Sequence, residues 1–231
     1  MVRRALVFGA SGAIGAAVVS ALEADGDVVV GTTRLASSTG ALIAVDPFDG
    51  SVGLAALDGA EPFDAVVWAQ GTNLNDSLLD FDLDAHLEVL NANVVFVAAT
   101  LAALLEMQLL RDGARLCVIS SIWQTMARDH KFSYTVSKAA LAGLVHSAAA
   151  DLAARGMLVN AVLPSVTDTA MTRAMLSAEQ IERFASATGF DRLTSLEDVA
   201  NTVAFLCSER NTGVTGQSIA VDLGYSKVRD V

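Results

Sequence analysis

Cysteine, proline, aromatic residues and positive charge are all scarce in this chain. Its 231 residues include 2 Cys and 3 Pro, 6% are aromatic, and 15 Lys and Arg are outnumbered by 26 Asp and Glu, for a formal net charge of −11. The acidic balance argues against binding to nucleic acid or to an anionic membrane surface. Cys117 and Cys207 lie far apart without metal-ligand spacing, so we expect buried free thiols, a cytoplasmic location and no metal.

Long apolar runs are also missing. The longest, 94–105, stops at Glu106, short of the ~20 residues that a membrane span needs. The N-terminus is basic and then apolar, but its apolar run is too short for a signal peptide. The length fits one α/β domain, residues 1–231, whose core needs neither disulfides nor metals.

A glycine-rich turn near the N-terminus predicts a nucleotide site. An apolar strand, 2–8, is followed by the turn and then by a helical run, 16–24. Glycines let the backbone approach a pyrophosphate, which rests on the N–H groups at the start of the helix. The alternative is a tight turn with a purely structural role. The candidate cofactor contacts in the turn are Gly9, Ser11, Gly12, Ala13, Ile14 and Gly15.

The second predicted strand, 27–34, indicates which cofactor binds. Its carboxyl end should lie beside the adenosine ribose, where a carboxylate favours NAD and an arginine beside a neutral residue favours a 2′-phosphate. Thr33 and Arg34 stand there, so we expect NADP(H). The alternative for Arg34 is an ordinary solvated charge.

Two further strand ends should face the same crevice. A third strand, 41–45, ends at Asp46, which either accepts from the adenine amino group or is a turn residue. A fourth, 65–68, leads into Ala69, Gln70 and Gly71, where glycine again allows close approach to a cofactor.

An acid/base pair is predicted near residue 134. If Tyr134 opens a helix, Lys138 lies one turn later on the same face. A nearby cation favours the phenolate, so we expect the pKa of Tyr134 to fall below that of a free phenol. Ser121 ends an apolar strand, where its hydroxyl could polarise a substrate carbonyl. Taken alone, however, the Tyr/Lys spacing is also typical of neighbours on a helix surface.

Other segments should complete the site. A long helix, 84–110, carries Asn91 and Asn93, and the loop 122–131 borders the site with Trp123 as a substrate contact. A strand closed by Pro164 precedes Ser165, a substrate contact. Pro164, Val166 and Thr169 should contact the cofactor at its nicotinamide end. Residues 172–190 form either a lid or a plain surface helix.

These markers together resemble the short-chain dehydrogenase/reductase family over nearly the whole chain. The resemblance implies a Rossmann-type doubly wound α/β fold, with a seven-stranded parallel sheet in the order 3-2-1-4-5-6-7. It also implies a catalytic tetrad, in which tyrosine transfers the proton, serine orients the carbonyl, lysine binds the ribose and lowers the tyrosine pKa, and asparagine anchors a water. The tetrad is Asn91, Ser121, Tyr134 and Lys138, with Asn91 preferred to Asn93 for its spacing to Phe96.

Several positions depart from the family pattern. Phe8 replaces the usual threonine before the first glycine, and the glycine spacing is that of atypical members. The segment from Trp68 to Gly71 replaces an Asn-Asn-Ala-Gly motif, whose hydrogen bonds in the sheet must be lost or replaced.

The resemblance predicts an NADP-dependent oxidoreductase that interconverts a ketone or aldehyde with an alcohol, similar to carbonyl or 3-oxoacyl reductases. One alternative is a non-catalytic NADP-binding regulatory protein on the same fold, although such proteins tend to lose the tyrosine or lysine. An extended-type epimerase is a further alternative, for which the C-terminal region is short. We expect a homotetramer or dimer, and a rather apolar substrate, on the basis of Trp123, Met126, Met171, Met175, Leu176 and Phe184.

Overall fold

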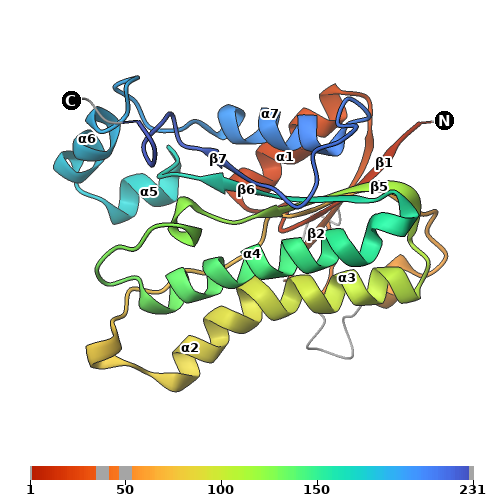
Figure 1. The fold of residues 1–231 in the computed structure, drawn as a ribbon, viewed down its shortest axis with the longest axis horizontal. Helices are drawn as coiled ribbons and strands as arrows, with labels where there is room; N and C mark the ends of the chain where they lie inside the picture. Colours follow the sequence, from red (N-terminus) through yellow and green to blue (C-terminus); the bar gives the residue numbers. More distant parts are fainter. Residues whose placement is uncertain (1, 35–41, 47–53, 229–231) are drawn as a thin grey trace.

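Seven parallel strands form one sheet in the order β3-β2-β1-β4-β5-β6-β7, which confirms the predicted topology (Figure 1). The computed structural model describes residues 2–34, 42–46 and 54–228, apart from the side chains of Ala170, Met171 and Met175. The third predicted strand is short, and its first residue, Ala41, lies outside the described residues. The strands are β1 (Arg4–Phe8), β2 (Val28–Thr33), β3 (Ile43–Ala44), β4 (Phe63–Trp68), β5 (Leu110–Ile119), β6 (Leu158–Pro164) and β7 (Ser218–Val221).

Helices cover both faces of the sheet, as the doubly wound fold requires (Figure 1). One face packs against α3 and α4, with α2 alongside, and the other packs against α1 and α7. The segment predicted as a lid or surface helix contains two short helices, α5 and α6, which follow the carboxyl end of β6. The helices are α1 (Ala13–Ala24), α2 (Leu83–Leu90), α3 (Phe96–Glu106), α4 (Phe132–Leu152), α5 (Ala170–Met175), α6 (Ala178–Ser186) and α7 (Leu196–Cys207).

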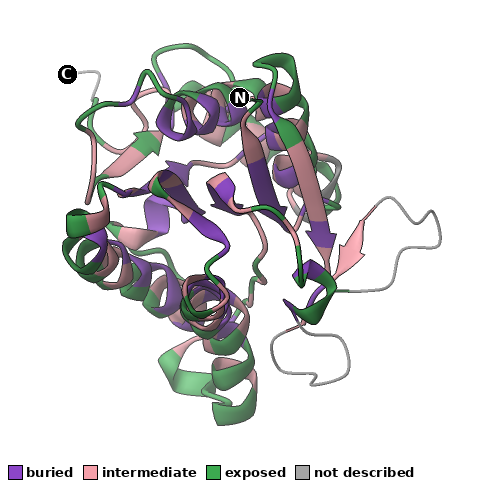
Figure 2. Cartoon of the chain, turned by 90° about the vertical axis from the view of Figure 1, so that its right-hand side faces the viewer, coloured by how far each residue is buried: buried purple, intermediate pink, exposed green. Residues whose placement is uncertain are grey.

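The central strands are buried (Figure 2). Their two faces differ in side-chain size. Ala5 and Val7 of β1 point toward α1 and α7, whereas Leu6 and Phe8 point toward α3 and α4. This alternation follows from the two-residue period of a strand. The neighbouring strand β4 repeats it, so helices α1 and α7 pack against the smaller side chains.

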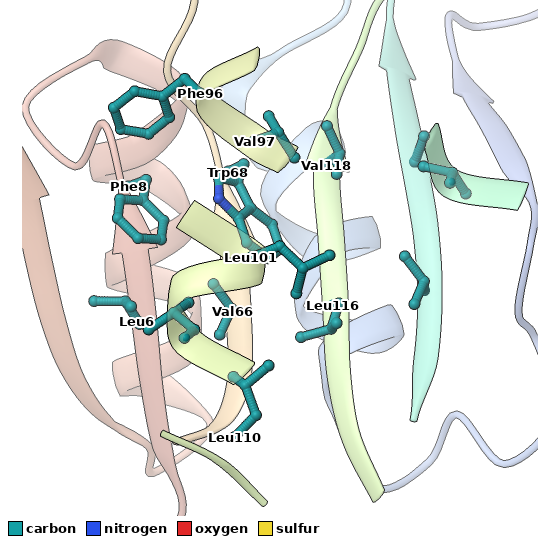
Figure 3. Packing of buried hydrophobic residues seen from close by; sticks show 14 of the residues in the cluster. Leu6, Phe8, Val66, Trp68, Phe96, Val97, Leu101, Leu110, Leu116 and Val118 are labelled. Atoms are coloured by element: carbon teal, nitrogen blue, oxygen red, sulfur yellow. The ribbon is translucent and has the colours of Figure 1, made fainter. Parts of the chain in front are cut away.

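Two departures from the family pattern pack against each other on the α3 side (Figure 3). Phe8 and Trp68 are paired in register between β1 and β4, and their rings stack with centroids 5.8 Å apart. Phe96 meets Phe8 edge to face at 5.6 Å, and the indole N–H of Trp68 donates to Thr100 Oγ1 at 2.8 Å. Aromatic stacking and this hydrogen bond therefore occupy the place of the polar contacts expected at strand four.

The long helix predicted from residue 84 exists, but it changes pitch. A π-helical turn, Asn91–Val95, joins α2 to α3, and the helix ends at Glu106, because β5 already begins at Leu110. In the part of the chain that the structure describes, Leu83–Glu106 is the one helix whose length and composition would allow it to cross a membrane. Buried core helices pass the same test, and this one packs Val97, Leu101 and Leu104 against the sheet.

Candidate active site

Two adjoining cavities open at the carboxyl ends of the strands. The larger encloses about 520 Å³ and the smaller about 260 Å³. Both are lined by Gly12, Ala69 and Gly71, so they form one crevice above β1 and β4. This is where an open parallel sheet binds its ligands.

Backbone geometry in the glycine turn suits a pyrophosphate. Gly9 has φ +76°, and a Cβ there would lie 2.6 Å from the backbone nitrogen of Gln70. A Cβ on Gly15 would lie 2.1 Å from Gly9 O, so only glycine lets α1 start against the turn. Gly12 caps α1 without a side-chain hydrogen bond, which leaves the first N–H groups of the helix available to an anion.

The smaller cavity has the polar lining that an adenosine phosphate needs. It is lined by Ser11, Thr33 and Arg34, and Ser11 Oγ donates to Thr33 Oγ1 at 3.2 Å. Both side-chain polar atoms of Gln70 are buried without a hydrogen-bond partner among the described residues, as expected of an amide that a ligand would satisfy. Asp46 follows Val45, which lines the smaller cavity, and its predicted adenine contact stays a prediction.

Three of the four predicted catalytic residues meet beside the larger cavity. Ser121 follows the end of β5, and Tyr134 lies in the first turn of α4. Both line the cavity, and their side chains are hydrogen-bonded to each other. Lys138 lies behind the tyrosine, with its Nζ 5.5 Å from the ring centroid and 3.0 Å from the Ile119 carbonyl oxygen to which it donates. The predicted acid/base pair is thus held by a helix and an adjacent strand end.

Electrostatics at Tyr134 differ from the expectation. Burial raises the pKa of the phenol above its ordinary value, and the hydrogen bond with Ser121 opposes that rise. Burial also lowers the pKa of Lys138 to about 8. The predicted fall in the tyrosine pKa counted on bound nicotinamide as well as on Lys138, and it stays a prediction for the complex. In the protein alone the pKa is raised, because loss of hydration disfavours the phenolate more than the Ser121 hydrogen bond favours it.

The structure brings Asn93 to this cluster, and not the predicted Asn91. Asn91 is exposed, whereas Asn93 is 1% exposed. Asn93 Oδ1 accepts from the Thr72 N–H at 2.8 Å, and its Nδ2 donates to Thr72 O at 3.0 Å and to Ser137 Oγ at 2.9 Å. A Cβ on Gly71 would lie 2.9 Å from Asn93 Oδ1 and 3.7 Å from Lys138 Nζ, so this glycine admits both groups.

The segment after β6 forms the opposite wall. Pro164 is buried at the end of that strand, and Ser165, Val166 and Thr169 line the larger cavity as predicted. Ser165 Oγ lies 2.6 Å from Thr194 Oγ1, and the Thr169 hydroxyl caps α5 by accepting from the Thr172 N–H.

Of the residues expected to make the pocket apolar, Trp123 and Leu176 line the larger cavity. Met126 and Phe184 do not line it, and the side chains of Met171 and Met175 are among those not described. The wall is completed by polar residues that were not predicted from the sequence, namely Asn73, Asn75, Arg128, Lys131, Thr167, Thr172 and Gln180.

The chain is similar in sequence and in fold to known proteins. A family model described as enoyl-(acyl carrier protein) reductase matches residues 54–226. The 3-oxoacyl-[acyl-carrier-protein] reductase FabG of Escherichia coli (strain K12) is 29% identical over 241 residues, covering 97% of both chains. Nodulation protein G of Rhizobium meliloti (strain 1021) is 30% identical over 243 residues, 98% of both. The structure of a gluconate 5-dehydrogenase from Burkholderia cenocepacia J2315, in complex with NADP and tartrate, has the same fold, with a TM-score of 0.89 at 21% identity over 98% of this chain and 96% of that one.

Proposed function

Since the chain belongs to the short-chain dehydrogenase/reductase family, we propose that it is an NADP-dependent oxidoreductase that interconverts a ketone or aldehyde with an alcohol. The observation that carries this proposal is the meeting of Ser121, Tyr134 and Lys138 beside a cavity that adjoins the glycine turn. The arrangement would place a carbonyl within reach of both hydroxyl groups and of the nicotinamide.

NADP would lie along the crevice. Its pyrophosphate would rest on the glycine turn and the start of α1, and its 2′-phosphate on Ser11, Thr33 and Arg34. Val166 and Thr169 would meet the nicotinamide. The gluconate 5-dehydrogenase with NADP supports this choice through its shared fold. When bound, NADPH supplies the hydride that adds to the carbonyl carbon and is itself oxidised to NADP⁺.

The protein supplies the proton and the orientation. Ser121 would donate a hydrogen bond to the carbonyl oxygen, and Tyr134 would transfer its phenolic proton to that oxygen and regain one from solvent. Because burial raises the pKa of Tyr134, the phenol is the form present near neutral pH, which suits the reductive direction. Lys138 would stabilise the phenolate left behind and bind the nicotinamide ribose.

Asn93 acts as a positioning residue in this scheme. It joins the loop after β4 to Ser137 of α4, and so fixes the helix that carries Tyr134 and Lys138. A Ser137 Oγ that donates to the Tyr134 carbonyl at 2.8 Å extends the same chain of hydrogen bonds.

The proposal is tested by following NADPH and NADH absorbance over a panel of ketones and aldehydes. We expect turnover with NADPH, and a loss of about 10²- to 10⁴-fold in kcat for Tyr134→Phe with little change in NADPH affinity. Near wild-type turnover by Tyr134→Phe would contradict the mechanism. Tight NADPH binding without turnover on any substrate would instead favour a non-catalytic regulatory protein.

The cofactor choice has a separate test. Arg34→Gln should raise the KM for NADPH about 10- to 100-fold while leaving the KM for NADH nearly unchanged, because only NADPH carries the 2′-phosphate. A wild-type preference for NADH would overturn the assignment.

We also propose a cytoplasmic homo-oligomer that acts on a small molecule and binds neither nucleic acid nor a membrane. Large apolar side chains are exposed along the segment that contains α2, with Leu79 98% exposed and Leu83 58% exposed. Val95 and Val136 are partly exposed on the turn before α3 and on α4. Light scattering at micromolar concentration should give a dimeric or tetrameric mass, and a monomeric mass would contradict this assembly.

A further inference from the structure

Two cations line the part of the site that is remote from the glycine turn, and a third lines a hollow beside it. Lys131 and Arg128 line the larger cavity together with Asn73 and Asn75. Arg128 also lines a neighbouring hollow of about 270 Å³ with Arg183. In a chain of net charge −11, this is a local concentration of positive charge at the substrate end of the crevice.

Lys131 is built into the wall. It is 7% exposed, and its Nζ donates to Asn73 Oδ1 at 2.8 Å, to Asn75 Oδ1 at 2.5 Å and to Leu74 O at 3.4 Å. All three acceptors are uncharged, so they fix the ammonium group without neutralising it. Because these acceptors take up all three N–H donors of Lys131, the ammonium group would attract an anion in the cavity by its charge, while the Arg128 guanidinium would donate hydrogen bonds to it.

The charges at the site also differ from those elsewhere on the protein. Seven arginines outside it form ion pairs with Asp or Glu: Arg3, Arg4, Arg111, Arg155, Arg173, Arg192 and Arg210. Among the described residues, no carboxylate lies within ion-pair distance of Lys131, Arg128 or Arg183.

The remaining groups around Lys131 do not remove its charge. Asp76 is the carboxylate that attracts it most, but the Asp76 oxygens accept from the N–H and Oγ of Ser133. Burial and the neighbouring Arg128 both lower the pKa of Lys131, and Asp76 opposes them. An anion between Lys131 and Arg128 would relieve the repulsion between the two cations.

We propose that the substrate carries a carboxylate or phosphate group that binds Lys131 and Arg128 while its carbonyl lies against Ser121 and Tyr134. This inference rests on the proposed function and names its substrate class. Lys131 Nζ lies 5.8 Å from the centroid of the Tyr134 ring, and both residues line the same cavity, so a short substrate can reach the cation and the phenol together. Short oxo acids and oxo phosphates satisfy this geometry, in contrast to the rather apolar substrate that the sequence indicated.

The test compares short oxo acids with their methyl esters, for example 4-oxopentanoate with methyl 4-oxopentanoate, and dihydroxyacetone phosphate with dihydroxyacetone. The wild-type enzyme should show a kcat/KM about 10- to 100-fold higher for the anion of at least one pair, as expected for a charged hydrogen bond. Preference within the oxo acid pair or within the phosphate pair identifies which anion the site selects.

Substitution of Lys131 and of Arg128 tests whether these cations cause the preference for anionic substrates. Lys131→Met and, separately, the exposed Arg128→Gln should reduce the ratio of anion to neutral turnover toward one. Lys227→Met is the matched control, because it removes an exposed lysine that lines none of these cavities and should keep the ratio. Arg128→Gln decides the matter if Lys131→Met does not fold.

A binding measurement separates this inference from the proposed function. Calorimetric titration of 4-oxopentanoate and of dihydroxyacetone phosphate into NADPH-saturated Tyr134→Phe should show binding of at least one anion. The double variant Tyr134→Phe/Arg128→Gln should not bind that anion. Turnover of the neutral partners as efficient as that of the anions overturns the anionic subsite but not the oxidoreductase. Anion binding that depends on Arg128, without turnover of any substrate by the wild type, overturns the oxidoreductase but supports the subsite. Equal binding with and without Arg128→Gln overturns the subsite.

Discussion

The two halves of the crevice are constructed in different ways. In the cofactor half, which we define as the smaller cavity with the glycine turn, the backbone decides the shape, since Gly9, Gly15 and Gly71 sit where a Cβ would collide with other atoms. In the substrate half, the wall of the larger cavity beyond Ser121, the shape and charge come from side chains such as Asn73, Arg128 and Lys131. Both halves join segments far apart in the sequence, but glycine backbone constrains the first and side chains shape the second.

This difference indicates how freely each half can change. A backbone turn tolerates almost no added atom, so substitution there affects folding and cofactor binding together. Side chains on a loop and on helix ends can be exchanged without disturbing the sheet, so the substrate half can change its ligand while the cofactor half stays constant. The predictions below test how sharp that division is.

The largest effect is expected at Gly15 of the cofactor half. Gly15→Ala would place a methyl group 2.1 Å from the carbonyl oxygen of Gly9, and backbone atoms cannot move aside cheaply. The free energy of unfolding should fall by about 3 kcal/mol or more, and NADPH affinity should fall more than about 10²-fold. Urea unfolding and calorimetric titration with NADPH measure the two effects.

Gly143 provides the matched control for that change. It lies within α4, and a Cβ there meets nothing within 4 Å, so Gly143→Ala should stabilise the protein by about 0.5–1 kcal/mol. Equal effects of the two substitutions would mean that the turn is not sterically constrained.

The next largest effect is expected from substitution of Asn93 and not of Asn91, and it tests the contacts between the two halves. Asn93→Ala would leave the buried Thr72 N–H and other polar groups without partners, which should cost about 2–3 kcal/mol of unfolding free energy. A small displacement of α4 should also reduce kcat about 10²-fold. Asn91→Ala, at an exposed position, should stay within about 0.5 kcal/mol of wild type. A larger effect of Asn91→Ala than of Asn93→Ala would instead assign Asn91 to the site.

The division also explains which features the sequence could predict. The glycine turn, the strand order and the grouping of Ser121, Tyr134 and Lys138 follow from local motifs and from the rule that parallel strands end at one edge. Asn91 was misassigned because spacing to Phe96 took no account of the π-helical turn. The helical period indicates Asn93 instead, since it lies on the same face as the buried residues Val97, Thr100 and Leu104.

The cations of the substrate half could not be selected in the same way. Arg128 and Lys131 occur in an ordinary polar loop, and their partners Asn73 and Asn75 lie in a segment distant in sequence. Only the folded chain shows that they face one cavity. The raised pKa of Tyr134 in the protein alone was hidden for a related reason, because spacing suggests a neighbouring charge but not the extent of burial.

A third prediction concerns Lys138, which lies between the two halves. Burial lowers its folded-state pKa to about 8, below the ~10.4 of an exposed lysine, so between these values the folded protein binds fewer protons than the unfolded chain. The penalty of burying the charge is therefore complete below pH 8 and diminishes as the pH rises toward 10. Relative to Lys138→Met, wild-type stability should increase by about 2 kcal/mol from pH 7 to pH 9.5 without cofactor. Urea unfolding of both proteins across this range measures it, and parallel curves would show that burial does not perturb this lysine.

The smallest effect tests the packing beneath the cofactor half. Trp68→Phe keeps an aromatic ring against Phe8 but removes the indole N–H that donates to Thr100 Oγ1, so the unfolding free energy should fall by about 1 kcal/mol. In a double-mutant cycle with Thr100→Val, the two losses should be less than additive, because the same hydrogen bond is removed by either change. NADPH affinity should stay constant, since Trp68 does not line either cavity. If Trp68→Phe changed NADPH affinity but not the free energy of unfolding, Trp68 would belong to the cofactor site. The steric constraint on the cofactor half would then include the core beneath it as well as its backbone.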